Sequence, residues 1–278
     1  FQVGVLDVHQ MEPSEWQEYR QRTPNAPALF VEEPGNGLEF AIKANQPPFD
    51  DSRIRLAAFM ALDPWKAIEE HWGGFAFVSA GFPVAEPGWL LAERDQRRFL
   101  NRPLDAKALL VDAGYTDPIP VTIKVGDFGN SYLNHANSIN VELSAVGFAP
   151  EVEIVNRRVF GEDIWLGGDY QMFVGPSAPI SAPNGYLLPV LHSNGVWNTT
   201  GHTDEELDAL LEAQAVSLDG AERQQLILKI QERVLSQGYR FMPAARTTIW
   251  TWAPRVHDFN PNFAGFEYIH WSRVWLDG

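Results

Sequence analysis

Cysteine is absent from this sequence of 278 residues, so disulfide bonds, thiolate zinc sites and cysteine nucleophiles are excluded. Basic residues are few: 21 Lys and Arg stand against 36 Asp and Glu, which gives a net charge of −15. Nucleic acids and anionic membrane surfaces are bound through basic surfaces, so this balance argues against both as partners. No apolar run approaches the length that a membrane span needs.

The common catalytic and cofactor motifs are also lacking. The sequence contains no His-Glu-x-x-His, no Gly-x-Ser-x-Gly, no phosphate loop and no dinucleotide fingerprint. His192 and His202 are too far apart for a metal pair on one helix face, and glycines interrupt them. We therefore expect both histidines in loops or caps, and we expect neither a metal nor another cofactor.

What is present is an ordinary globular composition, with 45% hydrophobic and 21% charged residues over a length that allows one or two domains. The stretch from Leu38 to Gly74 carries the clearest pattern. Alternation over 38–43 predicts a strand, and helical spacing over 54–61 predicts a helix that is buried on most sides. Asp50 or Asp51 is expected to cap it, and Asp63-Pro64 is expected to begin a second helix that ends at two glycines.

Strand and helix patterns alternate along the rest of the chain. Strands are predicted over 1–8, 28–32, 120–125, 152–155, 170–174 and 241–252. Helices are predicted over 13–22, 105–112, 131–146 and 158–166, after a capping box at Thr203–Glu206, and from Asp219 to Gly238. A turn is predicted over 33–37 and a loop-rich region over 75–103. Together these patterns predict an α/β lobe with a mixed sheet flanked by helices.

Three segments in the same order carry a family resemblance. They are Pro-Phe-Asp-Asp-Ser-Arg-Ile-Arg-Leu-Ala over 48–57, Lys-Ala-Leu-Leu-Val-Asp-Ala-Gly-Tyr over 107–115, and Asn-Thr-Thr-Gly-His-Thr-Asp over 198–204 before two antiparallel helices. These segments resemble the peptide/nickel-type extracellular solute-binding proteins, the capture subunits of ABC importers. The resemblance implies a periplasmic-binding-protein-like (class II) lobe that grips a solute and delivers it to permease subunits. It also implies an extracytoplasmic location, in the periplasm or at the cell surface through a lipid anchor, and no enzymatic activity.

The resemblance also suggests how the chain is divided. The match begins well inside a typical member, and the chain starts at Phe1 rather than methionine. We therefore expect a processed or trimmed piece that lacks most of the N-terminal lobe. Residues 1–255 would form the C-terminal ligand-binding lobe, and 256–278 a tail that returns to the missing N-terminal lobe.

The family's cleft segment follows a strand and contains an aspartate that anchors a peptide's α-amino group. Here the matching stretch is 175–186, with Pro179 in place of that aspartate and Pro176 in place of the family's tryptophan, while Asp169 would lie at the wrong end of the strand. Peptide-amine recognition is therefore in doubt, and an aromatic cleft without a carboxylate suits an uncharged solute such as an oligosaccharide. The candidate ligand-binding residues are Gly175, Ser177, Ala178, Ser181, Asn184, Tyr186 and Trp197. The candidate stacking surfaces are Trp165, Trp197, Trp250 and Trp252.

Two other classes of function fit the same composition. A Trp-rich acidic chain also suits a glycoside-active enzyme with paired carboxylates, which turnover of aryl glycosides would reveal. A third possibility is an interaction module that docks to a permease without any small ligand.

Overall fold

The computed structural model describes residues 6–84, 86–177, 182–260 and 271–277. The strands are β1 (Val8–Met11), β2 (Ala28–Ile42), β3 (Ala76–Ser79), β4 (Ile119–Gly126), β5 (Phe148–Val155), β6 (Met172–Pro176), β7 (Arg240–Trp252), β8 (Val256–His257) and β9 (Trp275–Leu276). The helices are α1 (Pro13–Arg22), α2 (Ser52–Ala61), α3 (Pro64–Trp72), α4 (Glu93–Gln96), α5 (Pro103–Asp112), α6 (Asn130–Val146), α7 (Arg157–Val159), α8 (Pro183–Tyr186), α9 (Glu205–Val216) and α10 (Gly220–Gln237). Two short 3-10 helices are η1 (Pro87–Trp89) and η5 (Trp271–Arg273), and two π-helical segments are η2 (Phe160–Leu166) and η3 (Leu187–Leu191).

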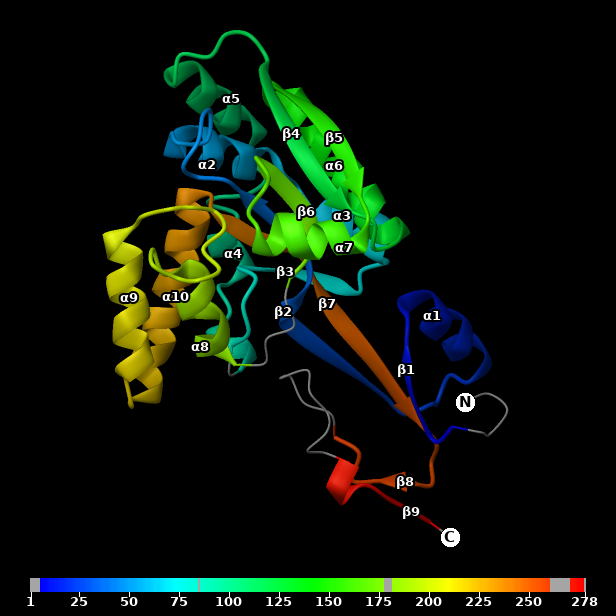
Figure 1. Ribbon diagram of the computed structural model, residues 1–278. Helices are drawn as coiled ribbons and strands as arrows, with labels where there is room; N and C mark the ends of the chain where they lie inside the picture. The colour runs from blue at the N-terminus through cyan, green and yellow to red at the C-terminus, as the bar shows by residue number, and fades with distance from the viewer. Residues whose placement is uncertain (1–5, 85, 178–181, 261–270, 278) are drawn as a thin grey trace.

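A seven-stranded mixed sheet organises these elements, as the alternating patterns predict. Its order is β1-β7-β2-β6-β4-β5, and β3 pairs with β7. Strand β4 pairs parallel with both β5 and β6. Strand β2 pairs antiparallel with both β6 and β7. The long strands β2 and β7 leave the helical body and reach a smaller region that we call the arm, formed by β1, α1, β8, β9 and the outer ends of β2 and β7 (Figure 1).

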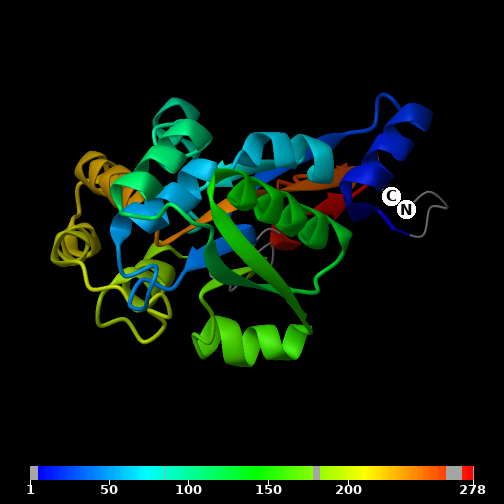
Figure 2. The ribbon, with the colours of Figure 1, turned by 90° about the horizontal axis from the view of Figure 1, so that it is seen from above.

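Both faces of the sheet are covered in the body. Leu38, Phe40 and Ile42 point to one face and join the core cluster that includes apolar residues of α2, α3, α5 and α6. Ala41 and Phe173 belong to a second cluster on the other face, with residues of η2, η3, α9 and α10. Figure 2 shows α6 and the helix formed by α7 and η2 on opposite sides of β4. Residues 38–42 of β2 are therefore buried on both faces of the sheet, although Glu39 among them is charged.

The helices after β2 begin where local chemistry predicts. Asp51 caps α2 by accepting a hydrogen bond from the backbone nitrogen of Arg53 at 2.8 Å. Asp63 caps α3 in the same way through the backbone nitrogen of Lys66 at 3.2 Å. Most of α2 is buried, which confirms that this helix is sandwiched between other elements. The predicted helices over 13–22, 105–112 and 131–146 and the long last strand are also present.

The predicted turn over 33–37 is wrong, because β2 runs through it. The strand pairs with β7 on both sides of these residues, and the register shifts between Glu33 and Gly37. The extra residues form a bulge, in which the carbonyl of Pro34 accepts a hydrogen bond from Ser79 Oγ at 2.7 Å. A Cβ at Gly37 would lie 2.2 Å from the carbonyl oxygen of Ala244. Proline and glycine thus mark a bulge in a continuous strand, a position that both residues favour.

Two predicted elements have other bounds in the described residues. The first strand begins at Val8, so residues 6–7 precede it, and residues 1–5 lie outside the described part. The N-cap of α9 is Asp204, whose side chain accepts from the backbone nitrogen of Leu207, so the capping box predicted at Thr203 is wrong by one residue. A carboxylate is the stronger acceptor and also favours the positive end of the helix dipole.

Candidate functional site

The parallel strands β4, β5 and β6 end at one edge of the sheet. Gly126 at the end of β4 lies opposite Val155 at the end of β5, and Val125 lies opposite Val174 of β6. In open α/β sheets, ligands bind outside the carboxyl ends of parallel strands, where the connecting loops meet. This edge is therefore the first place to look for a site.

A cavity of about 550 Å³ lies at this edge, lined by residues that follow all three parallel strands. Its aromatic lining consists of Phe128 after β4, Phe160 and Trp165 in η2, and Trp197. Hollows of about 640 Å³ beside Trp252 in the arm and about 580 Å³ between α3 and α4 lie away from these strand ends. Small-molecule sites are usually concave and mostly apolar with a few polar groups, which describes the cavity at the strand ends.

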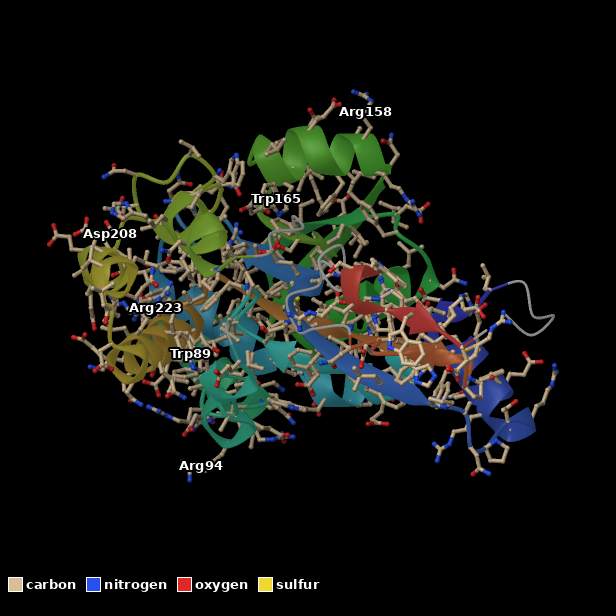
Figure 3. All side chains as sticks on the ribbon, turned by 90° about the horizontal axis from the view of Figure 1, so that it is seen from below. Trp89, Arg94, Arg158, Trp165, Asp208 and Arg223 are labelled. Carbon is tan, nitrogen blue, oxygen red and sulfur yellow. The ribbon has the colours of Figure 1, made fainter. Side chains whose placement is uncertain are left out.

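The aromatic rings of the cavity support one another. Trp165 and Trp197 meet edge to face with ring centroids 5.8 Å apart, and Phe128 meets Phe160 in the same way at 5.5 Å. Figure 3 shows Trp165 on the inner side of the α7–η2 helix and Arg158 on its outer side. Trp165 is buried, while Trp197 is partly exposed and offers a ring surface to the cavity.

A buried ion pair lies behind Trp165. Glu39 on β2 and Arg240 on β7 are both buried and lie 3.0 Å apart. Trp165 donates through Nε1 to Glu39 Oε2 at 3.2 Å, and the Tyr186 hydroxyl donates to Glu39 Oε1 at 3.0 Å. Burial raises the pKa of Tyr186, and the pKa of Arg240 is raised by the Glu39 carboxylate although burial opposes this. The four side chains therefore hold the inner wall of the cavity in one arrangement.

The polar groups of the cavity are few. Ser177, directly after β6, is buried, and its Oγ has no hydrogen-bond partner among the described residues. Arg157 donates through Nε to the backbone oxygen of Asp127 at 3.3 Å. Arg158 forms an ion pair with Glu162 at 2.7 Å. The cavity thus offers one unpaired hydroxyl and one guanidinium, and its carboxylate already has a partner.

Only some of the candidate ligand-binding residues named from the sequence line the cavity in the described structure. Ser177 and Trp197 line the cavity, whereas Ala178 and Ser181 lie outside the described residues. Gly175 is buried at the end of β6, where a Cβ would lie 2.1 Å from the ring of Phe160, so its role is to admit that ring.

Two further candidates point elsewhere. Tyr186 is fully buried and uses its hydroxyl on Glu39. The Asn184 side-chain oxygen accepts from Gln214 Nε2 at 2.8 Å and lies 3.3 Å from Arg223 Nη2, so it joins α8 to α9 and α10. Neither residue lines the cavity in the described structure.

The structure also shows where the other predicted residues lie, namely Trp250, Trp252 and Asp169. Trp250 and Trp252 pack against Phe259 in the arm, at 5.5 Å and 5.4 Å between ring centroids, and do not line the cavity. Asp169 precedes β6 and pairs with Lys124 at 2.8 Å, which confirms that it lies at the other end of the strand.

Sequence reasoning missed Phe128, Arg157 and Phe160. A signal for the first two was present, because each lies within three residues of the end of a predicted strand, and the ends of parallel strands share one edge. Phe160 could not be found in this way, because its ring occupies space left by two glycines on other strands, Gly126 and Gly175.

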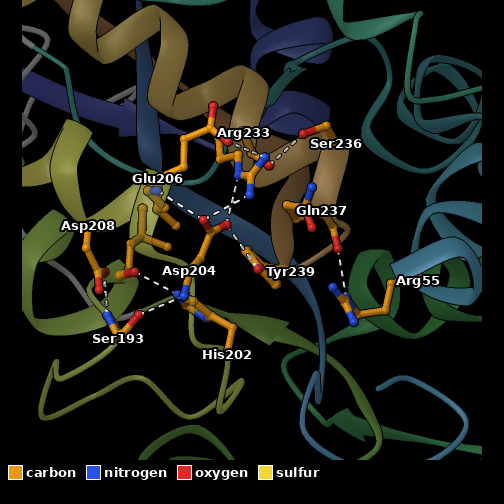
Figure 4. A network of polar contacts seen from close by, with 12 residues as sticks. Arg55, Ser193, His202, Asp204, Glu206, Asp208, Arg233, Ser236, Gln237 and Tyr239 are labelled. Atoms are coloured by element: carbon orange, nitrogen blue, oxygen red, sulfur yellow. Dashed lines mark hydrogen bonds and ion pairs between the residues drawn. The ribbon is translucent and has the colours of Figure 1, made fainter. Parts of the chain in front are cut away.

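A polar network joins the start of α9 to α10 and to the residue before β7 (Figure 4). Asp204 accepts two hydrogen bonds from Arg233, at 2.9 and 3.0 Å, and one from the Tyr239 hydroxyl at 3.1 Å. His202 is buried against the carbonyl of Leu191 at 2.7 Å, and burial lowers its pKa to about 4. His202 is therefore a neutral structural residue of the loop that follows Trp197.

A family model matches most of this chain, and this match decides its family. The model of the bacterial extracellular solute-binding proteins, family 5 middle region, matches residues 1–198. This chain belongs to the family 5 extracellular solute-binding proteins. Among the residues that the structure describes, this family 5 chain has no helix long and apolar enough to cross a membrane. Nor do three His, Asp or Glu side chains come together as a metal site within the described ranges.

Solved structures share the fold of this family 5 chain at low identity. HbpA2 of Haemophilus parasuis is 20% identical, with a TM-score of 0.78 over 99% of this chain and 54% of its own. The periplasmic binding protein DppA of Helicobacter pylori, in complex with the peptide STSA, is 19% identical, with a TM-score of 0.76 over 100% of this chain and 54% of its own. AgaA of A. tumefaciens, in complex with agropinic acid, is 20% identical, with a TM-score of 0.73 over 100% and 57%.

The chain therefore spans little more than half the length of these solved structures. They confirm a mixed sheet flanked by helices of the periplasmic-binding-protein type. No curated protein sequence gives a significant match.

Proposed function

We propose that this chain is the C-terminal lobe of the solute-capture component of an ABC importer. The observation that carries the proposal is the aromatic cavity at the carboxyl ends of β4, β5 and β6 in a family 5 sheet. A solute would be held between this edge and a second lobe, with capture by hinge closure and delivery to permease subunits. The location would be extracytoplasmic, in the periplasm or at the cell surface through a lipid anchor.

The second lobe would be the N-terminal lobe of the same protein. Residues 1–255 would form the lobe described here, and 256–278 a tail that returns to the other lobe. The arm supports this division, because Phe30, Trp271 and Trp275 are 46%, 43% and 51% exposed. Aromatic surface gathered in one region favours contact with another part of a protein.

The solute would be an oligosaccharide or peptide, or a similar small molecule. Trp197 and Phe128 offer ring faces that suit sugars and apolar side chains alike. Glu162 is already paired with Arg158, so the described lining has no carboxylate left for an ammonium group. This arrangement favours an oligosaccharide over a peptide held by its α-amino group.

The chain would act as a binder and not as an enzyme. Glycosidases use two carboxyl groups on either side of the scissile bond. The described lining of this cavity contributes one, Glu162, and it is held by an ion pair. Detection of a solute bound at the cavity would also show that the chain is a capture protein and not an interaction module without a small ligand.

The test is a solute panel of tripeptides and neutral oligosaccharides, titrated into the chain while the indole N–H signals of Trp165 and Trp197 are followed by NMR. We expect at least one solute to shift both signals. If the intact protein binds at about micromolar, near −8 kcal/mol, one lobe alone should bind at about millimolar. Turnover of an aryl glycoside that Glu162→Gln abolishes would contradict the proposal, as would binding that leaves both indole signals unchanged.

A further inference from the structure

The guanidinium of Arg157 is held at the cavity without an acidic partner. Its Nε donates to the backbone oxygen of Asp127, and its charge lies 5.2 Å from the ring centroid of Phe128. Among the residues that the structure describes, no carboxylate lies within ion-pair distance of it. These contacts hold the exposed Arg157 beside Phe128 in the cavity lining, and its terminal nitrogens have no acceptor among the described residues.

Ser177 supplies an independent observation that points to a ligand. Ser177 is 9% exposed and lines the same cavity, and its Oγ has no hydrogen-bond partner in the described part of the chain. A buried hydroxyl without a hydrogen-bond partner costs free energy of folding, so buried hydroxyls usually form a hydrogen bond to protein, water or a ligand. An acceptor on a bound solute would satisfy it.

The local charge is positive in an otherwise acidic protein. The charged residues that line the cavity are Arg157, Arg158 and Glu162, and the last two neutralise each other at 2.7 Å. One positive charge remains, whereas the whole chain has a net charge of −15. The N-terminus of α6 follows Phe128 directly and has no side-chain cap, which adds the positive end of a helix dipole beside the same wall.

From these contacts we propose, resting on the proposed function, that the solute carries a carboxylate held by Arg157 and Ser177. Its ring-shaped body would lie against Trp197. A guanidinium and a hydroxyl together donate several hydrogen bonds to one carboxylate, and such charge-assisted bonds are the stronger ones. The chemical class is therefore an acidic ring compound, such as a uronate-containing saccharide, rather than a neutral sugar or an ammonium ligand.

The test compares two probes that differ only in the acidic group: phenyl β-D-glucuronide and phenyl β-D-glucoside. Each is titrated into the chain with isotope-labelled tryptophan, and the Trp165 and Trp197 indole signals are assigned from Trp→Phe variants. We expect the glucuronide to shift both signals and to bind about tenfold more tightly than the glucoside.

Variants separate the anchor from general charge. Arg157→Gln should remove the preference for the glucuronide over the glucoside, and Ser177→Ala should weaken glucuronide binding about threefold. The matched control is the double variant Arg158→Gln/Glu162→Gln, which removes a neighbouring cation together with its partner. Since its net charge is unchanged, it should keep the preference.

Equal or tighter binding of the glucoside, or a preference that survives Arg157→Gln, would overturn this inference. If a neutral saccharide or a tripeptide shifts both indole signals while the glucuronide has no advantage, capture at the cavity stands and the acidic class is wrong. If none of these solutes shifts either signal, the proposed function fails with it.

Discussion

The buried pair of Glu39 and Arg240 allows a quantitative test of how the cavity wall is held. Both side chains have almost no exposed surface, 0% and 1%, and their charged atoms lie 3.0 Å apart. Removing one partner of such a pair leaves a buried charge without compensation, which costs about 3 to 5 kcal/mol. We therefore expect Glu39→Leu and Arg240→Met each to lower the free energy of unfolding by that amount.

The double variant Glu39→Leu/Arg240→Met should be more stable than either single variant. It removes both charges. Trp165 Nε1 and the Tyr186 hydroxyl lose their acceptor, while the contacts that Arg240 donates to Tyr186 and Thr199 are long, at 3.3 and 3.4 Å. Each lost hydrogen bond costs about 1 kcal/mol, so the double variant should lose about 2 kcal/mol. The pair therefore specifies the position of Trp165 more than it stabilises the fold.

Urea unfolding followed by tryptophan fluorescence measures all four proteins of this cycle. Thermal unfolding gives a second reading, because each kcal/mol shifts the Tm of a domain of this size by about 2 °C. The control is Glu162→Gln, which breaks an exposed ion pair with Arg158 and should cost less than about 1 kcal/mol. A double variant that loses the sum of the two single losses would refute the reasoning, since the two charges would then be independent.

Three further outcomes follow from other contacts. Hydrogen bonds from the paired arginine lower the pKa of Asp204 although burial opposes them, so Asp204→Asn should cost about 2 kcal/mol at pH 7. That difference should shrink as the pH falls below about 4, because the carboxyl of the unfolded chain takes up a proton there while the folded carboxylate, with its lowered pKa, keeps its charge to lower pH. Burial raises the pKa of Glu142 to about 7, so the folded protein loses stability as the pH rises from 4.5 to 7. Glu142→Gln should therefore have a higher Tm than the wild type at pH 8 and a similar one at pH 5. Gly175→Ala should cost about 1 to 3 kcal/mol because its Cβ would meet Phe160, whereas Gly161→Ala, with open space at its Cβ, should not destabilise the protein.

Local chemistry made much of the fold predictable. Asp51 and Asp63 cap their helices through contacts within three residues, and such contacts depend on neighbouring sequence alone. The alternation over 38–43 likewise identified a strand whose two faces join different core clusters. The prediction failed at residues 33–37, because a proline and two glycines suit a turn and a bulge equally well. Only pairing with β7 decides between them.

The candidate site depended on contacts that no local pattern records. Ser177 was predicted because it lies in the stretch that resembles the family's cleft segment, and it lines the cavity. Tyr186 follows in the same stretch, yet its hydroxyl turns inward to Glu39, 147 residues away in the sequence. A side chain in a loop can face either way, and the distant partner that decides its direction is invisible to spacing and composition.

The sequence by itself thus determined the family, the α/β class and the positions of most helices and strands, because caps, periodicity and ordered motifs act over short distances. Only the tertiary structure decided which strand ends meet, and so brought Phe128, Arg157 and Ser177 to one cavity. The physical reason is that parallel strands join residues far apart in the chain through the order of the sheet, and that order is set by packing over the whole lobe.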